Sequence, residues 1–84
     1  MKTKTIRKGA IHVSQALLLL ESGKPCDLRL WKLATGDILR YEQVRCIGHF
    51  YRGGTYKVVF PLSRQIRRFR TFTLFEINGM EIYL

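Results

Sequence analysis

The sequence has few acidic residues and no long hydrophobic run. Only 6 of its 84 residues are Asp or Glu, against 15 Lys or Arg, so the formal net charge is +9. The longest uninterrupted apolar run covers residues 16–20, whereas a membrane-spanning helix needs about 20 apolar residues. Residues 1–10 are charged and lead into no apolar segment with a cleavage site, so a secretory signal is not supported. We therefore expect a cytoplasmic protein with no membrane partner.

Cysteine is also scarce, and this scarcity argues against a metal site. Cys26 and Cys46 have no second Cys or His at metal-ligand spacing, so the paired pattern of a structural zinc site is missing. Both are expected on strand faces shared with apolar residues. We interpret them as reduced core thiols, with a disulfide between neighbouring strands as the alternative.

Catalytic patterns are lacking as well. His12 and His49 show no local set of nucleophile, base and orienting group, and the acids are interspersed with basic residues. The Gly53-Gly54 pair is too short for a phosphate-binding loop and fits a hairpin turn. The sequence thus predicts a protein that is not an enzyme and uses no cofactor or metal.

Aromatic residues are plentiful, which excludes a disordered basic tail. The apolar spacing after His12, followed by Gly23 and Pro25, predicts a helix over residues 13–22. Beyond it the apolar period changes to two, and turn signals, including Asn78-Gly79, separate the segments. The predicted strands cover 26–31, 38–41, 43–51 after a bend at Glu42, 55–60, 65–70, 74–77 and 80–84.

These elements predict a mainly β (α+β) fold, in which a short N-terminal helix precedes five to six antiparallel strands. Such a meander tends to curl, so we expect a small SH3-like barrel or a curled meander. Residues 1–10 are expected to form a basic flexible arm, and residues 11–84 a single small β domain. In the strand over 43–51, the pattern places Phe50 on the same face as Val44 and Cys46.

Positive charge is concentrated where acids are missing. Every formal charge between Gln43 and Phe75 is positive, and most of these residues are arginine, which suits phosphate or carboxylate binding. The alternative is a solvated strand face. Arginine beside aromatic rings is typical of proteins that bind single-stranded nucleic acid. The candidate nucleic-acid-binding residues are Arg52, Lys57, Arg64, Arg67, Arg68, Arg70, Tyr51 and Tyr56, with Trp31 as a further stacking candidate.

Three segments carry a resemblance: GKPCDLRLWK (23–32), RGGTYKVVF (52–60) and FEINGMEIYL (75–84). Together they are similar to small uncharacterised proteins encoded on mobile elements and prophages of Bacteroidetes. The resemblance implies a nucleic-acid binder, an inhibitor or regulator, or a virion component, and it transfers no site residues.

Two functions follow as hypotheses. The first is a small non-enzymatic module that binds DNA or RNA through an Arg-rich β surface, assisted by the basic arm. The second is a protein interaction or assembly module, such as a phage or mobile-element structural or regulatory component. It would use strand edges, or the face that carries Trp31 and Leu33, to bind another protein or form a homo-oligomer.

Overall fold

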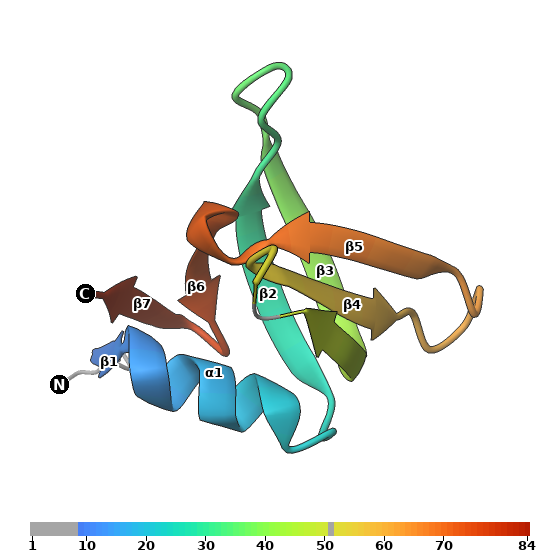
Figure 1. The fold of residues 1–84 in the computed structure, drawn as a ribbon, viewed down its shortest axis with the longest axis horizontal. Coiled ribbons are helices and arrows are strands. Elements are labelled where there is room, and N and C mark those ends of the chain that lie inside the picture. The colour runs from blue at the N-terminus through green and yellow to red at the C-terminus, as the bar shows by residue number, and fades with distance from the viewer. Residues whose placement is uncertain (1–8, 51) are drawn as a thin grey trace, which may run out of the picture.

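A short helix and a seven-stranded sheet form the fold in the computed structural model, which describes residues 9–50 and 52–84 (Figure 1). Among these residues, no helix is long and apolar enough to cross a membrane. The elements in chain order are β1 (Ala10–His12), α1 (Val13–Glu21), β2 (Cys26–Trp31), β3 (Ile38–Phe50), β4 (Thr55–Val59), β5 (Ile66–Arg70), the 3-10 helix η1 (Thr71–Thr73), β6 (Leu74–Ile77) and β7 (Met80–Tyr83). The predicted mainly β fold with an N-terminal helix is confirmed.

The sheet has the order β1-β7-β6-β2-β3-β4-β5, so β1 and β5 are its edges and it is not closed. A closed SH3-like barrel is therefore not confirmed. The prediction of five to six antiparallel strands is wrong in two respects, because β1 is an additional strand and pairs with β7 in parallel. Ala10, which we expected in the flexible arm, begins β1, and residues 1–8 of that arm lie outside the described residues.

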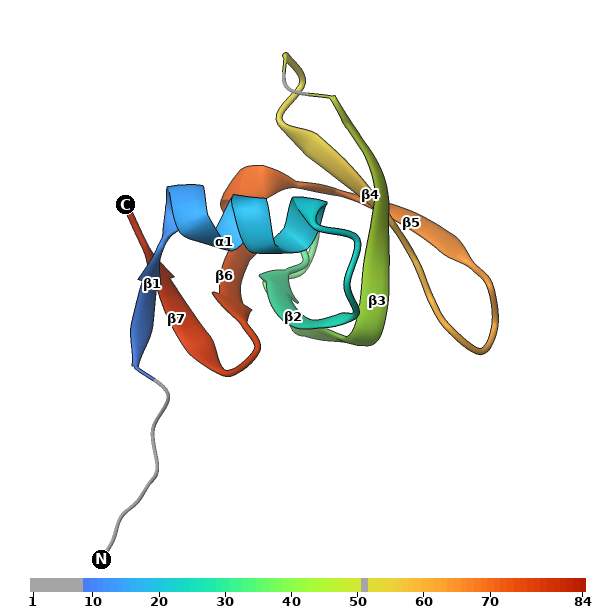
Figure 2. The same cartoon turned by 90° about the horizontal axis from the view of Figure 1, so that it is seen from below.

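Helix α1 begins at Val13, as predicted, and ends at Glu21, one residue earlier than predicted. The His12 Nδ1 atom accepts a hydrogen bond of 3.1 Å from the Ser14 backbone N–H, which satisfies one of the free donors at the helix start. Gly23 follows the helix with φ +82°, a conformation that glycine adopts without steric cost. Ala16 and Leu20 are fully buried where α1 packs against β1, β3 and β7 (Figure 2).

Strand β3 bends at Gln43. It pairs with β2 from Ile38 to Val44, where Val44 lies opposite Cys26, and with β4 from Arg45 onward. Gln43 has φ +56°, and its backbone N–H and side-chain amide both donate to Asp27 Oδ1 at 2.9 Å. The bend predicted at Glu42 thus lies one residue further on. It turns the β3–β4–β5 part of the sheet away from the part that contains β2.

The β6–β7 hairpin turns at Asn78 and Gly79, as the sequence predicted, and both residues have positive φ. The Asn78 N–H donates to the Asp27 carbonyl at 2.8 Å, and the Asp27 N–H donates to Asn78 Oδ1 at 2.9 Å. Asp27 therefore connects β2 with both the hairpin turn and the bend in β3.

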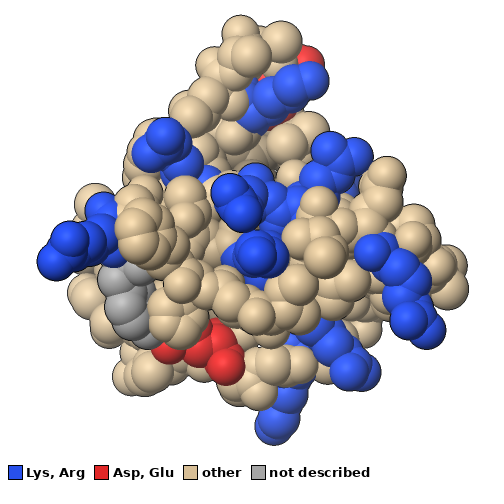
Figure 3. All heavy atoms as spheres, turned by 45° about the vertical axis from the view of Figure 1, so that its right-hand side comes forward, with Lys and Arg blue, Asp and Glu red and all other residues tan. Residues whose placement is uncertain are grey.

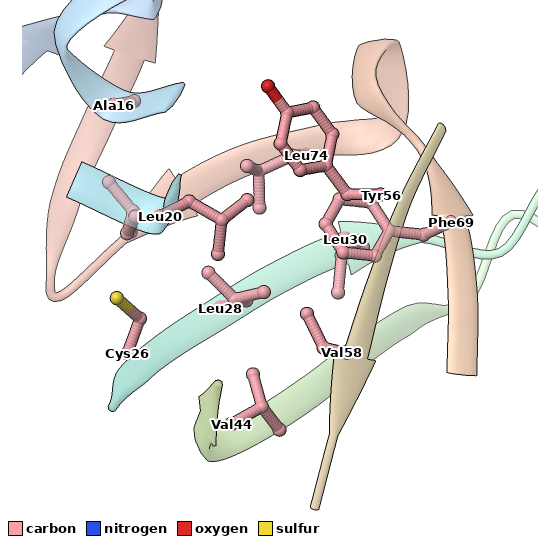
Figure 4. Close-up of a cluster of buried hydrophobic side chains, with 11 residues drawn as sticks. Ala16, Leu20, Cys26, Leu28, Leu30, Val44, Tyr56, Val58, Phe69 and Leu74 are labelled. Atoms are coloured by element: carbon pink, nitrogen blue, oxygen red, sulfur yellow. The ribbon is translucent and has the colours of Figure 1, made fainter. Parts of the chain in front are cut away.

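The hydrophobic core lies between α1 and the curled sheet (Figure 4). The rings of Tyr56 and Phe69 stack with 6.2 Å between their centroids, and Tyr56 is only 2% exposed. Its hydroxyl donates to a Glu21 carboxylate oxygen and so connects β4 with α1. The buried hydrophobic residues are Ala16, Leu20, Cys26, Leu28, Leu30, Val44, Tyr56, Val58, Phe69, Leu74 and Ile77.

Candidate nucleic-acid interface

The outward side of β3, β4 and β5 carries a group of basic side chains that we call the basic face. Directly opposite residues of antiparallel strands share a face, so the strand register identifies its members. Tyr56 and Val58 of β4 and Phe69 of β5 point into the core, so the residues that alternate with them along each strand point outward. The basic face consists of Arg45, Gly48, Phe50, Thr55, Lys57, Val59, Ile66, Arg68 and Arg70.

Lys57 and Arg68 lie directly opposite each other in the centre of the basic face. Two backbone hydrogen bonds, one just beyond each end of the β4–β5 ladder, show which opposite pairs are hydrogen-bonded: the Phe60 N–H donates to the Gln65 carbonyl, and the Thr71 N–H donates to the Gly54 carbonyl. By this alternation Lys57 and Arg68 form a non-hydrogen-bonded pair, in which side chains approach most closely. Like charges in that position repel each other and destabilise a sheet.

No acidic side chain compensates this repulsion within the described part of the chain. All 6 acids are described, and within residues 9–50 and 52–84 the one salt bridge between a Lys or Arg and an acidic side chain joins Arg29 to Glu76 at 3.2 Å. Arg29 also lies opposite another arginine, Arg40, but there Glu76 forms an ion pair with Arg29. Glu76 lies in β6, which is next to β2 and not next to the arginine-rich strand β5.

Several acids bind within other parts of the fold. Asp27 accepts hydrogen bonds from Gln43, and Asp37 accepts one from Thr35. Viewed toward the β4–β5 end, Lys and Arg side chains are spread over the surface and gather near its centre, while acidic atoms appear only near the top and in the lower left part (Figure 3). The charge of this surface is therefore strongly positive.

The predicted site residues do not all share this face. Lys57, Arg68 and Arg70 lie on it. Arg67 has the orientation of the core residue Phe69 and reaches solvent at the rim, where its guanidinium donates to Gln65 at 3.4 Å. Arg52 lies in the β3–β4 turn and Arg64 in the β4–β5 turn, at the two ends of β4.

Two of the predicted stacking residues, Tyr56 and Trp31, do not lie on the basic face. Tyr56 was expected at the surface and is buried, because it fills the core beside Phe69. Trp31 is 45% exposed but packs against Phe75, with 4.9 Å between ring centroids, on another part of the sheet. Tyr51 lies outside the described residues.

The sequence reasoning missed Phe50 because of a β-bulge. Cys46 lies opposite Val58, but Gly48, two residues later, lies opposite Lys57 rather than two positions along β4. The extra residue at Ile47 reverses which side chains point inward. Phe50 was expected on the core face and is instead 60% exposed beside the basic residues. A register shift of this kind leaves no clear signal in the sequence.

A hollow of about 310 Å³ opens at this bulge. Gly48 and Phe50 from β3 and Lys57 and Arg68 from the neighbouring strands line it, together with His49, Thr55 and Tyr56. The space above Gly48 is open, because a Cβ atom there would meet no heavy atom within 4 Å. The Phe50 ring rests on Gly53, where a Cβ would lie 2.6 Å from Phe50 Cδ2. The ring is thus supported on one side.

The thiols and histidines form no separate reactive centre. Both cysteines are free, and burial raises the pKa of the Cys26 and Cys46 thiols above the ordinary value of 9.0. The contact between His12 Nδ1 and Ser14 Oγ, at 2.8 Å, was not anticipated and belongs to the helix cap. Among residues 9–50 and 52–84, no group of three or more His, Cys, Asp or Glu side chains could hold a metal ion.

Comparison of the chain with protein-family models, with curated proteins and with solved structures finds no match. The resemblance to mobile-element and prophage proteins therefore stays a prediction. Any function must be argued from the chemistry of the described surface.

Proposed function

We propose that the chain is a small non-enzymatic module that binds nucleic acid through the basic face. The observation that carries this proposal is the uncompensated Lys57–Arg68 pair, flanked by Arg45 and Arg70. A polyanion would remove the repulsion by placing phosphates between these side chains. Arginine suits that role because its planar guanidinium donates two parallel hydrogen bonds to a phosphate. The Arg52 and Arg64 turns would extend the contact at either end of β4.

Phosphate binding predicts a strong dependence on salt, because each neutralised phosphate releases condensed counterions. With four basic side chains engaged, the plot of log K against log salt concentration should have a slope of about −3 for a single strand. Fluorescence anisotropy with labelled DNA and RNA, single- and double-stranded, measures this slope. Arg68→Gln should weaken binding and make the slope less negative by about 0.7.

A matched control is Arg29→Gln, because Arg29 is an arginine of the same sheet that is already paired with Glu76. Its replacement should leave nucleic-acid affinity unchanged. Absence of binding to every nucleic acid at low salt would remove the proposal, as would equal effects of the two arginine substitutions.

A protein interaction or assembly module is the second candidate, favoured by the free edge of β5. The ladder alternation directs the backbone N–H and C=O groups of Ile66, Arg68 and Arg70 away from β4. Such an edge can pair with a strand of another protein or of a second copy. Light scattering should then show oligomers that Ile66→Pro disperses, since this proline removes an outward N–H and keeps the bonds to β4. A monomer at every concentration, with no bound partner, would contradict it.

We also propose that strands β2 to β6 form an SH3-like arrangement. Strands β2 to β6 have the order β6-β2-β3-β4-β5, in which η1 returns the chain so that β6 pairs with β2. The bent β3 takes part in both halves of this arrangement, which supports an open variant of a small barrel. A role in a phage or mobile element is proposed from the sequence resemblance alone.

A further inference from the structure

We infer that the hollow at the β3 bulge receives an unpaired base, so that the nucleic acid bound by the basic face is single-stranded. This inference rests on the proposed function and specifies its ligand. It is carried by the juxtaposition, around one hollow, of an exposed aromatic ring, an open glycine and two cations that form no salt bridge within residues 9–50 and 52–84.

The aromatic wall of the hollow is Phe50. Its ring rests on Gly53 on one side and is 60% exposed, so a planar ligand has access to it. Base stacking on such a ring is favourable for every base, because each base has an aromatic face. Support from Gly53 limits the freedom of the ring and so lowers the entropy lost on binding.

The floor of the hollow is formed where Gly48 has no side chain. Gly48 lies opposite Lys57, in a strand where a larger residue would otherwise cover the backbone. Its φ is not positive, and the space above it is empty of protein atoms. Glycine is therefore not required by backbone strain or crowding at this position. Its effect is to leave room for a ligand of the size that the hollow of about 310 Å³ accepts.

The charged wall is formed by Lys57 and Arg68, which also lie at the centre of the basic face. A base seated on Phe50 would place its own or its neighbour's phosphate within reach of these cations. In a duplex the bases are stacked and paired, so none can enter a hollow unless it is first extruded. Duplexes would contact only the charged groups and would bind less tightly.

The test uses the full chain and three labelled probes of about 12 nucleotides, a length within the range that one small β domain covers. The probes are oligothymidylate, an abasic strand with the same number of phosphates, and a hairpin duplex. Wild-type protein should bind oligothymidylate at least about fivefold more tightly than the abasic strand, since stacking of one base contributes about 1–3 kcal/mol. It should also prefer oligothymidylate to the duplex.

Two uncharged changes address the hollow. Gly48→Leu fills it and Phe50→Ala removes its stacking wall. Both should lower the affinity for oligothymidylate to that for the abasic strand, while the salt dependence stays unchanged because no charge is lost. Gly48→Ala, a smaller filling, should have an intermediate effect. Phe72→Ala is the matched control, because Phe72 is 71% exposed and lies outside the hollow. Circular dichroism and thermal midpoints establish that each variant is folded.

The results separate this inference from the proposed function. If Gly48→Leu and Phe50→Ala bind oligothymidylate as wild type does while Arg68→Gln weakens binding, the inference is wrong and the basic face still binds nucleic acid. Equal affinity for the duplex or for the abasic strand would also overturn the inference. Failure to bind any probe at low salt would overturn both.

Discussion

Replacing Lys57 with glutamine should stabilise the fold and weaken nucleic-acid binding at the same time. The substitution removes one of two like charges that lie directly opposite each other, with no carboxylate to compensate them. Cross-strand pairs contribute about 0.2–1 kcal/mol, so relief of this repulsion should raise the free energy of unfolding within that range. In a domain of this size, about 0.5 kcal/mol corresponds to a rise of roughly 2–4 °C in the thermal midpoint.

The assay is urea and thermal unfolding at low and high salt, followed by anisotropy titration with an oligonucleotide. Because 1 M salt reduces the Debye length to about 3 Å, the stability gain should largely disappear there. Binding at low salt should weaken, and its salt dependence should lose about 0.7 of slope for a single strand. A charge that lowers stability but raises affinity is consistent with selection for binding.

The control for this prediction is Arg29→Gln. Arg29 also lies opposite an arginine, Arg40, but it forms an ion pair with Glu76, so its loss should bring no stabilisation. The reasoning would be refuted if Lys57→Gln left stability unchanged or lowered it at low salt. It would also be refuted if the gain were the same in 1 M salt, because the repulsion would then not be its cause.

Two further predictions concern the fold. Because burial raises the pKa of Cys26 above 9.0, the folded state keeps a proton that the unfolded state loses. This contribution to stability is complete below pH 9.0 and decreases as the pH rises toward the folded-state pKa. Between about pH 8 and about pH 10, the free energy of urea unfolding should therefore fall more for wild type than for Cys26→Ala. An equal fall in both proteins would contradict this prediction. His12→Ala should cost about 0.5–2 kcal/mol through loss of the helix cap, whereas His12→Asn, which can cap the helix, should cost less in the same unfolding measurement. Equal instability of both variants would show that the cap is unimportant.

The parts of the fold that local chemistry determines could be predicted from the sequence. The helix end follows from Gly23 and Pro25, and the β6–β7 hairpin from Asn78-Gly79, because these residues favour particular backbone conformations. Strand β1 could not be predicted, since three residues are too few to show a period. Its parallel pairing with β7 depends on the position of α1, which is a tertiary property.

The candidate site was only partly predictable. An acid-free, arginine-rich segment correctly identifies Lys57, Arg68 and Arg70 as neighbours. Which aromatic rings are exposed depends on packing: Tyr56 and Phe50 are both aromatic residues beside basic ones, yet the first is buried and the second is exposed. The bulge at Ile47 decides this difference, and only the strand register reveals it.

This bulge separates the side that a residue takes at the end of β3 from its position counted along β3. Removal of the residue at position 47 would restore a regular ladder, and Gly48, His49 and Phe50 would keep Lys57, Tyr56 and Thr55 as their partners. Phe50 would then still lie on the basic face, although the strand would be one residue shorter. The register with β4 therefore selects this surface, and a deletion of one residue at the bulge conserves it. Engineered variants of this strand should accordingly be compared by their alignment to β4, since counting along β3 alone would place these side chains on the wrong sides.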